Sequence, residues 1–133
     1  MEGTALASQQ SVLIVDRCEE TREVLRTALE RRGLRIFTTP RRRQGLELAR
    51  RHRLDLIVLD LELDCADGEE SAAPLVRQSQ TDCTPLVVLG TVRRRSSPLP
   101  GREFIAKPYH YGPLIRKIEE LLSTTQQTPA RSA

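Results

Sequence analysis

The sequence predicts a doubly wound α/β fold, in which a parallel sheet is covered by helices on both faces. Short aliphatic, β-branched runs recur along the chain and alternate with longer segments of helical periodicity. Three of these runs end on a charged residue, namely Asp16, Asp60 and Lys107. Because parallel strands deliver their carboxyl ends to one edge of the sheet, we expect these three side chains to meet in one cleft.

Length and composition set the limits of this prediction. The 133 residues, of which 38% are hydrophobic and 29% charged, fit one domain, expected at 11–122 between polar tails at 1–10 and 123–133. No segment resembles a secretory signal or a membrane span, so the cytoplasm is the expected location. The three cysteines have neither CxxC spacing nor nearby histidines and are expected to be reduced thiols: Cys18, Cys65 and Cys83.

The first half of the chain predicts three strands and two helices. Gly33 ends the first helix, and a proline at position 40 closes the second strand. The expected elements are a strand at 11–16, a helix at 19–32, a strand at 34–38, a helix at 41–52 and a strand at 54–60.

The second half continues the alternation less regularly. An acidic segment at 61–68 precedes a weak helix at 69–80, whose regular part begins near Ala73 because Pro74 fits only a first helical turn. Strands at 85–91 and 104–106 flank a stretch with two prolines and a glycine that cannot form a long helix, and a last helix covers 109–122. Five strands in this arrangement predict the flavodoxin-like order 2-1-3-4-5, with the fourth helix shortened or missing.

The net charge of +3 conceals clusters of arginine at 41–43, 50–53 and 93–95. These clusters could bind phosphate backbone or an acidic partner. The alternative, which we favour because no aromatic residue is interleaved for base stacking, is that they form solvated helix faces. We therefore expect no direct contact with nucleic acid.

Four strand motifs in order carry a family resemblance across 11–122: VLIVD ending at Asp16, DLIVLD ending at Asp60, PLVVLGT ending at Thr91, and FIAKP with Lys107 and Pro108. This set resembles the response regulator receiver domain of two-component signalling. The resemblance implies a cytoplasmic phosphoprotein of a phosphorelay, in which Asp60 is the phosphoacceptor and Lys107 pairs with it. It further implies a cis Lys107–Pro108 bond.

The resemblance also implies Mg²⁺ as cofactor, held by Asp16, Asp60 and the backbone carbonyl of Glu62. A carboxylate attacks phosphorus only when the charge of the incoming phosphoryl oxygens is neutralised, and Mg²⁺ with a lysine ammonium supplies that charge. A buried ion-pair cluster kept for packing is the alternative interpretation of the three charged residues, and it is costly to build without function.

Three positions depart from the family pattern. Arg17 stands where a second acid commonly binds Mg²⁺, so binding is weakened, or absent if Arg17 occupies the site. Gly90 replaces the threonine or serine of the switch, and the Thr91 hydroxyl, one residue on, points to the opposite face of a regular strand unless Gly90 bends the chain. Phe104 occupies the place of the rotating aromatic, where we expect an ordinary core residue.

The favoured function is a single-domain receiver that accepts a phosphoryl group on Asp60 and signals by protein contact. Its partners would be a histidine kinase or phosphotransfer protein and a downstream protein target, and a homodimer is compatible with the sequence. The alternative is a phosphorylation-independent pseudo-receiver that acts as a protein-binding module. A third and weaker interpretation, a hydrolase similar to haloacid dehalogenases, needs further acids and a cap. The chain is not expected to be an enzyme beyond its own phosphorylation.

Overall fold

The structure, a computed structural model, describes residues 9–61, 72–90 and 102–127, with side chains described as far as residue 124. Within this part of the chain, strands and helices alternate as the sequence predicts. No helix in these ranges is both long and apolar enough to cross a membrane.

The sheet has five parallel strands in the order β2-β1-β3-β4-β5, which confirms the predicted topology. Three central strands consist entirely of buried residues, as expected when helices cover both faces. The strands are β1 (Ser11–Val15), β2 (Arg35–Thr39), β3 (Leu56–Asp60), β4 (Leu86–Gly90) and β5 (Arg102–Ala106).

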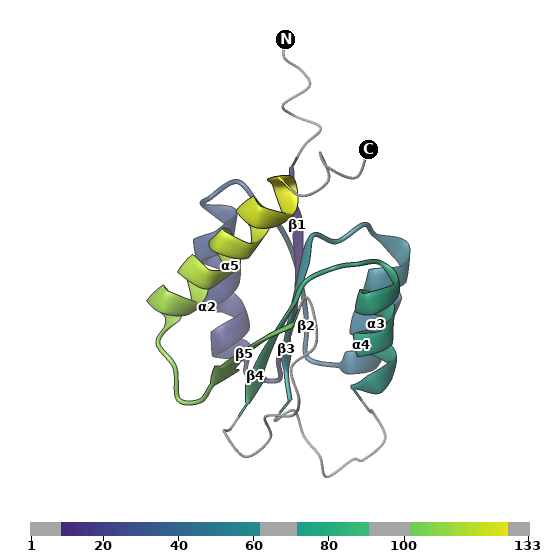
Figure 1. The fold of residues 1–133 in the computed structure, drawn as a ribbon. Coiled ribbons are helices and arrows are strands. Elements are labelled where there is room, and N and C mark those ends of the chain that lie inside the picture. The colour runs from purple at the N-terminus through teal and green to yellow at the C-terminus, as the bar shows by residue number, and fades with distance from the viewer. Residues whose placement is uncertain (1–8, 62–71, 91–101, 128–133) are drawn as a thin grey trace.

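Four helices lie in the described residues, two on each side of the sheet (Figure 1). Helices α2 (Glu19–Glu30) and α5 (Tyr111–Gln127) cover one face, and α3 (Arg42–Arg51) and α4 (Ala73–Thr81) cover the other. This is the number of helices expected when the fold's fourth helix, the one between β4 and β5, is shortened. Its expected place, 91–101, lies outside the described residues.

Alternate residues of each strand feed two separate cores. On the α2 and α5 side, Val12, Ile14 and Val58 pack with the apolar faces of both helices. On the α3 and α4 side, Leu13, Val15 and Leu59 do the same. Because side chains alternate along a strand, Asp16 points to the same side as Ile14, and Asp60 to the same side as Val58, which is the side covered by α2 and α5.

Most element boundaries differ from the prediction by one or two residues, and the main extensions are in β5 and α5. Strand β5 begins at Arg102, because its first residues pair with β4 at the sheet edge, where polar side chains remain half-exposed. Helix α5 continues past Leu122 to Gln127, and in this added turn the Thr124 hydroxyl donates to the Glu120 carbonyl. Helix α4 begins at Ala73, where the regular part was predicted.

Candidate functional site

A cleft of about 820 Å³ opens at the carboxyl edge of the sheet. It forms where β1, β3 and β5 end, so it is the place where the sequence predicts three charged strand ends to meet. The lining residues are Asp16, Arg17, Cys18, Thr21, Asp60, Lys107, Pro108, Tyr109 and Tyr111.

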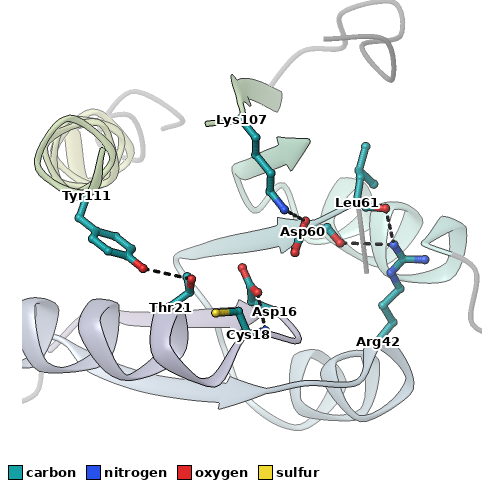
Figure 2. A network of polar contacts seen from close by, with 8 residues as sticks. All are labelled: Asp16, Cys18, Thr21, Arg42, Asp60, Leu61, Lys107 and Tyr111. Atoms are coloured by element: carbon teal, nitrogen blue, oxygen red, sulfur yellow. Dashed lines mark hydrogen bonds and ion pairs between the residues drawn. The ribbon is translucent and has the colours of Figure 1, made fainter. Parts of the chain in front are cut away.

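Asp60 and Lys107 form an ion pair in this cleft (Figure 2). The Lys107 ammonium donates to Oδ1 of Asp60 over 2.8 Å, and Asp60 is only 5% exposed. Backbone hydrogen bonds hold the main chain at both positions. The Lys107 N–H donates to the Gly90 carbonyl, and the N–H of Leu61, which follows Asp60, donates to the Leu89 carbonyl. The ammonium is therefore held beside a buried carboxylate by the sheet itself.

Asp16 places a second carboxylate in the cleft, and it is only 2% exposed. Its Oδ1 accepts the Cys18 N–H over 2.9 Å. Burial, and to a smaller degree repulsion from Asp60, raise the pKa of Asp16 from its ordinary value of 3.8 to about 6. The folded protein thus holds two carboxylates close together at an energetic cost.

Two arginines hold the main chain beyond these two carboxylates. The Arg22 guanidinium donates to the carbonyls of Asp16, over 2.7 Å, and Arg17, over 3.1 Å. The Arg42 guanidinium donates to the carbonyls of Asp60 and Leu61, over 3.3 and 3.2 Å (Figure 2). Each strand end that carries a cleft aspartate is therefore bound by a guanidinium.

The opposite wall of the cleft is built from hydroxyl groups of α2 and α5. The Thr21 hydroxyl lies 3.2 Å from that of Tyr111 (Figure 2), and the Tyr109 ring meets the Tyr111 ring edge-on at 6.0 Å. Burial, and secondarily the charge of Asp16, raise the pKa of Tyr109, which keeps the phenol protonated. Hydrogen bonding from the Thr21 side chain lowers the pKa of the exposed Cys18 thiol at the start of α2.

The structure brings together Asp16, Asp60 and Lys107, as the strand ends predict. The Lys107–Pro108 peptide bond is cis, the isomer that the resemblance implies. Arg17 is exposed and lines the cleft. Gly90 is buried at the end of β4, opposite Ala106, and offers no hydroxyl.

Other predicted site residues lie farther from the cleft or beyond what the structure describes. Phe104 packs, half-buried, against the core on the α3 and α4 side. Glu62 and Thr91 lie outside the described residues, as does the third cysteine, Cys65.

The arginine clusters separate into different environments. Arg41 and Arg43 are exposed, but Arg42 between them reaches the end of β3. The cluster at 50–53 lines a second cavity of about 650 Å³ at the amino ends of β3 and β4, away from the carboxylates. Arg50 and Arg51 fall in the last turn of α3, where the helix dipole favours cations. The cluster at 93–95 lies outside the described residues.

The two carboxylates fit a magnesium ion. Mg²⁺ prefers hard oxygen ligands and is commonly bound by one or two carboxylates together with waters and phosphate oxygens. Asp16 and Asp60 offer such a pair, and a divalent cation between them would relieve the repulsion that helps to raise the Asp16 pKa. Among the described residues no three His, Cys, Asp or Glu side chains gather as a metal site.

Together, fold and site define a flavodoxin-like α/β protein with an acidic cleft and a paired lysine at the carboxyl edge of its sheet. The model of the response regulator receiver domain matches residues 12–119. The chain belongs to this receiver domain family.

Similar proteins agree with this assignment. The chain is 32% identical over 125 residues to the KDP operon transcriptional regulatory protein KdpE of Escherichia coli, which covers 90% of this chain and 54% of KdpE. It is 30% identical over 122 residues to the transcriptional regulatory protein SrrA of Staphylococcus aureus, and this match covers 88% of this chain and 49% of SrrA. The chain thus spans about half the length of these relatives.

Among solved structures, the chemotaxis protein CheY4 of Vibrio cholerae superposes with a TM-score of 0.68 at 24% identity, covering 86% of this chain and 99% of CheY4. At this identity the likeness speaks for the fold alone. It agrees with the family assignment that the sequence comparison gives.

Proposed function

We propose that this protein accepts a phosphoryl group on Asp60 from a histidine kinase or phosphotransfer protein and signals through contact with a protein target. The observation that carries the proposal is the pairing of Lys107 with Asp60 at 2.8 Å, with the Asp16 carboxylate in the same cleft. Membership of the receiver family supports phosphorelay signalling in general.

The transfer follows from the chemistry of a buried carboxylate. An oxygen of Asp60 attacks phosphorus, the bond from phosphorus to the donor's imidazole nitrogen breaks, and an acyl phosphate forms on Asp60. Lys107 first neutralises the carboxylate and then pairs with a phosphoryl oxygen. Beyond this modification of its own side chain, we propose no enzymatic turnover.

Asp16, Asp60 and the backbone carbonyl of Glu62 are the proposed magnesium ligands. When bound, Mg²⁺ supplies positive charge to the phosphoryl oxygens. Arg17, exposed on the rim of the same cleft, adds a second source of positive charge and lowers the affinity for the metal relative to a carboxylate at that position. We propose that this chain needs more Mg²⁺ than relatives with two adjacent acids.

The readout of phosphorylation is proposed to differ from the usual threonine switch. Gly90 has no side chain to bond the phosphoryl group, and Phe104 packs in the core on the other face. Thr91 would take part only if the chain bends after Gly90. The comparisons lend no support to the alternative of a phosphorylation-independent binding module.

Intact-mass measurement after incubation with acetyl phosphate and Mg²⁺ tests the proposal. We expect the wild type to gain one phosphoryl group, Asp60→Asn to gain none, and Asp82→Asn, an exposed carboxylate on α4's carboxyl end, to behave as the wild type. Label that persists in Asp60→Asn would contradict the assignment of the acceptor.

Arg17→Asp separates two causes of a negative result. If the wild type takes no label but Arg17→Asp does, the defect lies in the metal site, and Asp60 is still able to accept a phosphoryl group. If neither is labelled over a wide range of Mg²⁺ concentration, the proposed function is wrong.

A further inference from the structure

We propose that Arg42 is a positioning residue for the phosphorylation of Asp60, because its guanidinium, delivered by α3, fixes the main chain of the acceptor. This inference rests on the proposed function and adds a residue that lies outside the cleft. Arg42 donates to main-chain carbonyls at the end of β3, and among the described residues it is not one that lines the cleft.

The contacts show how Asp60 is held at two points. Lys107 binds its carboxylate over 2.8 Å, and Arg42 binds its carbonyl over 3.3 Å and the next carbonyl, that of Leu61, over 3.2 Å (Figure 2). The lysine comes from the end of β5 and the arginine from α3. One guanidinium nitrogen, Nη2, donates to both successive carbonyls and so ties the peptide unit between them to α3.

The place of Arg42 in its helix argues against an incidental contact. It is the first residue of α3, whose first turn contains no acidic residue. A cation at a helix amino end is opposed by the helix dipole, so an arginine there is stabilised by other partners. Arg43, its neighbour, is exposed, whereas Arg42 is half-buried and donates to the two carbonyls.

The packing of α3 brings Arg42 within reach of β3. Gly45, one turn further on the same helix face, lies so close to β1 that a Cβ atom there would stand 2.8 Å from Cγ2 of Val15. Any larger residue would push the helix away from the sheet. The glycine therefore sets the distance from which Arg42 reaches the end of β3.

The start of α3 is fixed as well. The buried Thr39 hydroxyl accepts the Arg41 N–H over 3.1 Å and donates to Oε1 of Gln44 over 2.6 Å. Between this hydroxyl and Gly45, the backbone of Arg42 has little room to move. The guanidinium is thus presented by a rigid support.

The expected kinetic effect follows from this geometry. In-line attack needs the acceptor oxygen near its reaction position, and a displacement of about 1 Å can cost up to about a hundredfold in rate. Because Arg42 binds main-chain carbonyls and is not one of the lining residues of the cleft, we expect it to act on the position of Asp60 and not on donor binding. Its loss should lower the maximal rate and leave the half-saturating donor concentration unchanged.

The test compares wild type, Arg42→Ala, Arg42→Lys and the matched control Arg43→Ala, using acetyl phosphate with saturating Mg²⁺ and intact mass as the readout. We expect Arg42→Ala to lower the maximal rate of labelling about tenfold or more, with an unchanged half-saturating concentration. Arg42→Lys keeps the charge, but its ammonium ends one atom short of the position of Nη2 and reaches the two carbonyls less well, so its rate should fall about threefold or more. Arg43→Ala should match the wild type.

Amide hydrogen exchange supplies a readout that is independent of labelling. The Leu61 N–H donates to the Leu89 carbonyl over 2.8 Å. In Arg42→Ala this amide should exchange about tenfold faster, while the amide of Val58, inside β3, keeps its wild-type rate.

The outcomes separate the two proposals. A labelled wild type together with wild-type rates in Arg42→Ala overturns the positioning role and leaves the proposed function standing. If Arg42→Ala does not fold, a wild-type rate in Arg42→Lys overturns it in the same way. If neither the wild type nor Arg17→Asp takes label, the proposed function is overturned, and the positioning role with it.

Discussion

Replacing Asp16 by asparagine should make the protein more stable at neutral pH, although the change removes a cleft residue. The carboxylate of Asp16 is 2% exposed and shares the cleft with that of Asp60. Asparagine has nearly the same shape, and its Oδ1 can still accept the Cys18 N–H that Asp16 accepts over 2.9 Å. The substitution therefore removes the buried charge and keeps the hydrogen bond.

The raised pKa of Asp16 gives the magnitude. A rise from 3.8 to about 6 corresponds to about 3 kcal/mol, since each pKa unit is worth about 1.4 kcal/mol. We take this as the upper limit for the gain in the free energy of unfolding in Asp16→Asn at pH 7. A protein that tolerates such a cost at one side chain has a use for the charge.

The pH dependence has a definite sign. Between pH 3.8 and about 6 the folded protein binds more protons at Asp16 than the unfolded chain does. The contribution of Asp16 to the free energy of unfolding therefore falls as pH rises through this window and stays low above it. The difference between Asp16→Asn and wild type should be small near pH 4 and reach its full size near pH 7.

Urea unfolding followed by circular dichroism, from pH 4 to pH 7.5, measures this difference. Asp82→Asn, which changes an exposed carboxylate, is the matched control and should stay within about 0.5 kcal/mol of wild type. Added Mg²⁺ should stabilise the wild type at pH 7 more than Asp16→Asn. An Asp16→Asn variant that is less stable than wild type at pH 7, or a difference independent of pH, would refute the reasoning.

Two further predictions concern single side chains. The lowered pKa of the exposed Cys18 thiol should make this thiol react with iodoacetamide at neutral pH faster than the same cysteine in the urea-unfolded chain. Peptide mass mapping would measure both rates. Equal rates would contradict the Thr21 hydrogen bond as the cause of the lowered pKa. The ion pair between Arg32 and Glu119 joins the turn after α2 to α5 over 2.7 Å at the surface, so Glu119→Gln should lower the free energy of unfolding by less than about 1 kcal/mol. That small loss should shrink further in 1 M salt, and a larger, salt-independent loss would count against a surface ion pair.

The fold could be predicted because its signals are local. Each buried run ends on the residue that the strand presents to the cleft, so Asp16, Asp60 and Lys107 follow directly from strand assignment. The limits of the outer elements follow less well. The polar residues from Arg102 onwards belong to β5 because they pair with β4, and such pairing leaves no mark in hydrophobic periodicity.

The main-chain contacts of the site could not be predicted from the sequence. Arg41, Arg42 and Arg43 have the same side chain, and only the orientation of α3 on the sheet decides that the middle one reaches β3. Arg22 on α2 likewise reaches the Asp16 carbonyl, six residues back along the chain, because of the path that the main chain takes between β1 and α2. The absence of an acidic residue from the first turn of α3 indicates that the arginine there has other partners, but this signal can be used only once the start of the helix is known.

The cleft also has an optical consequence. The chain has two tyrosines and no tryptophan, and both tyrosines, Tyr109 and Tyr111, line the cleft that contains Asp60. The ultraviolet emission of the native protein therefore originates at the edge of the acidic site. A cation or phosphoryl group that arrives there would change the surroundings of both tyrosines, so the tyrosine emission of the protein should report on its own site.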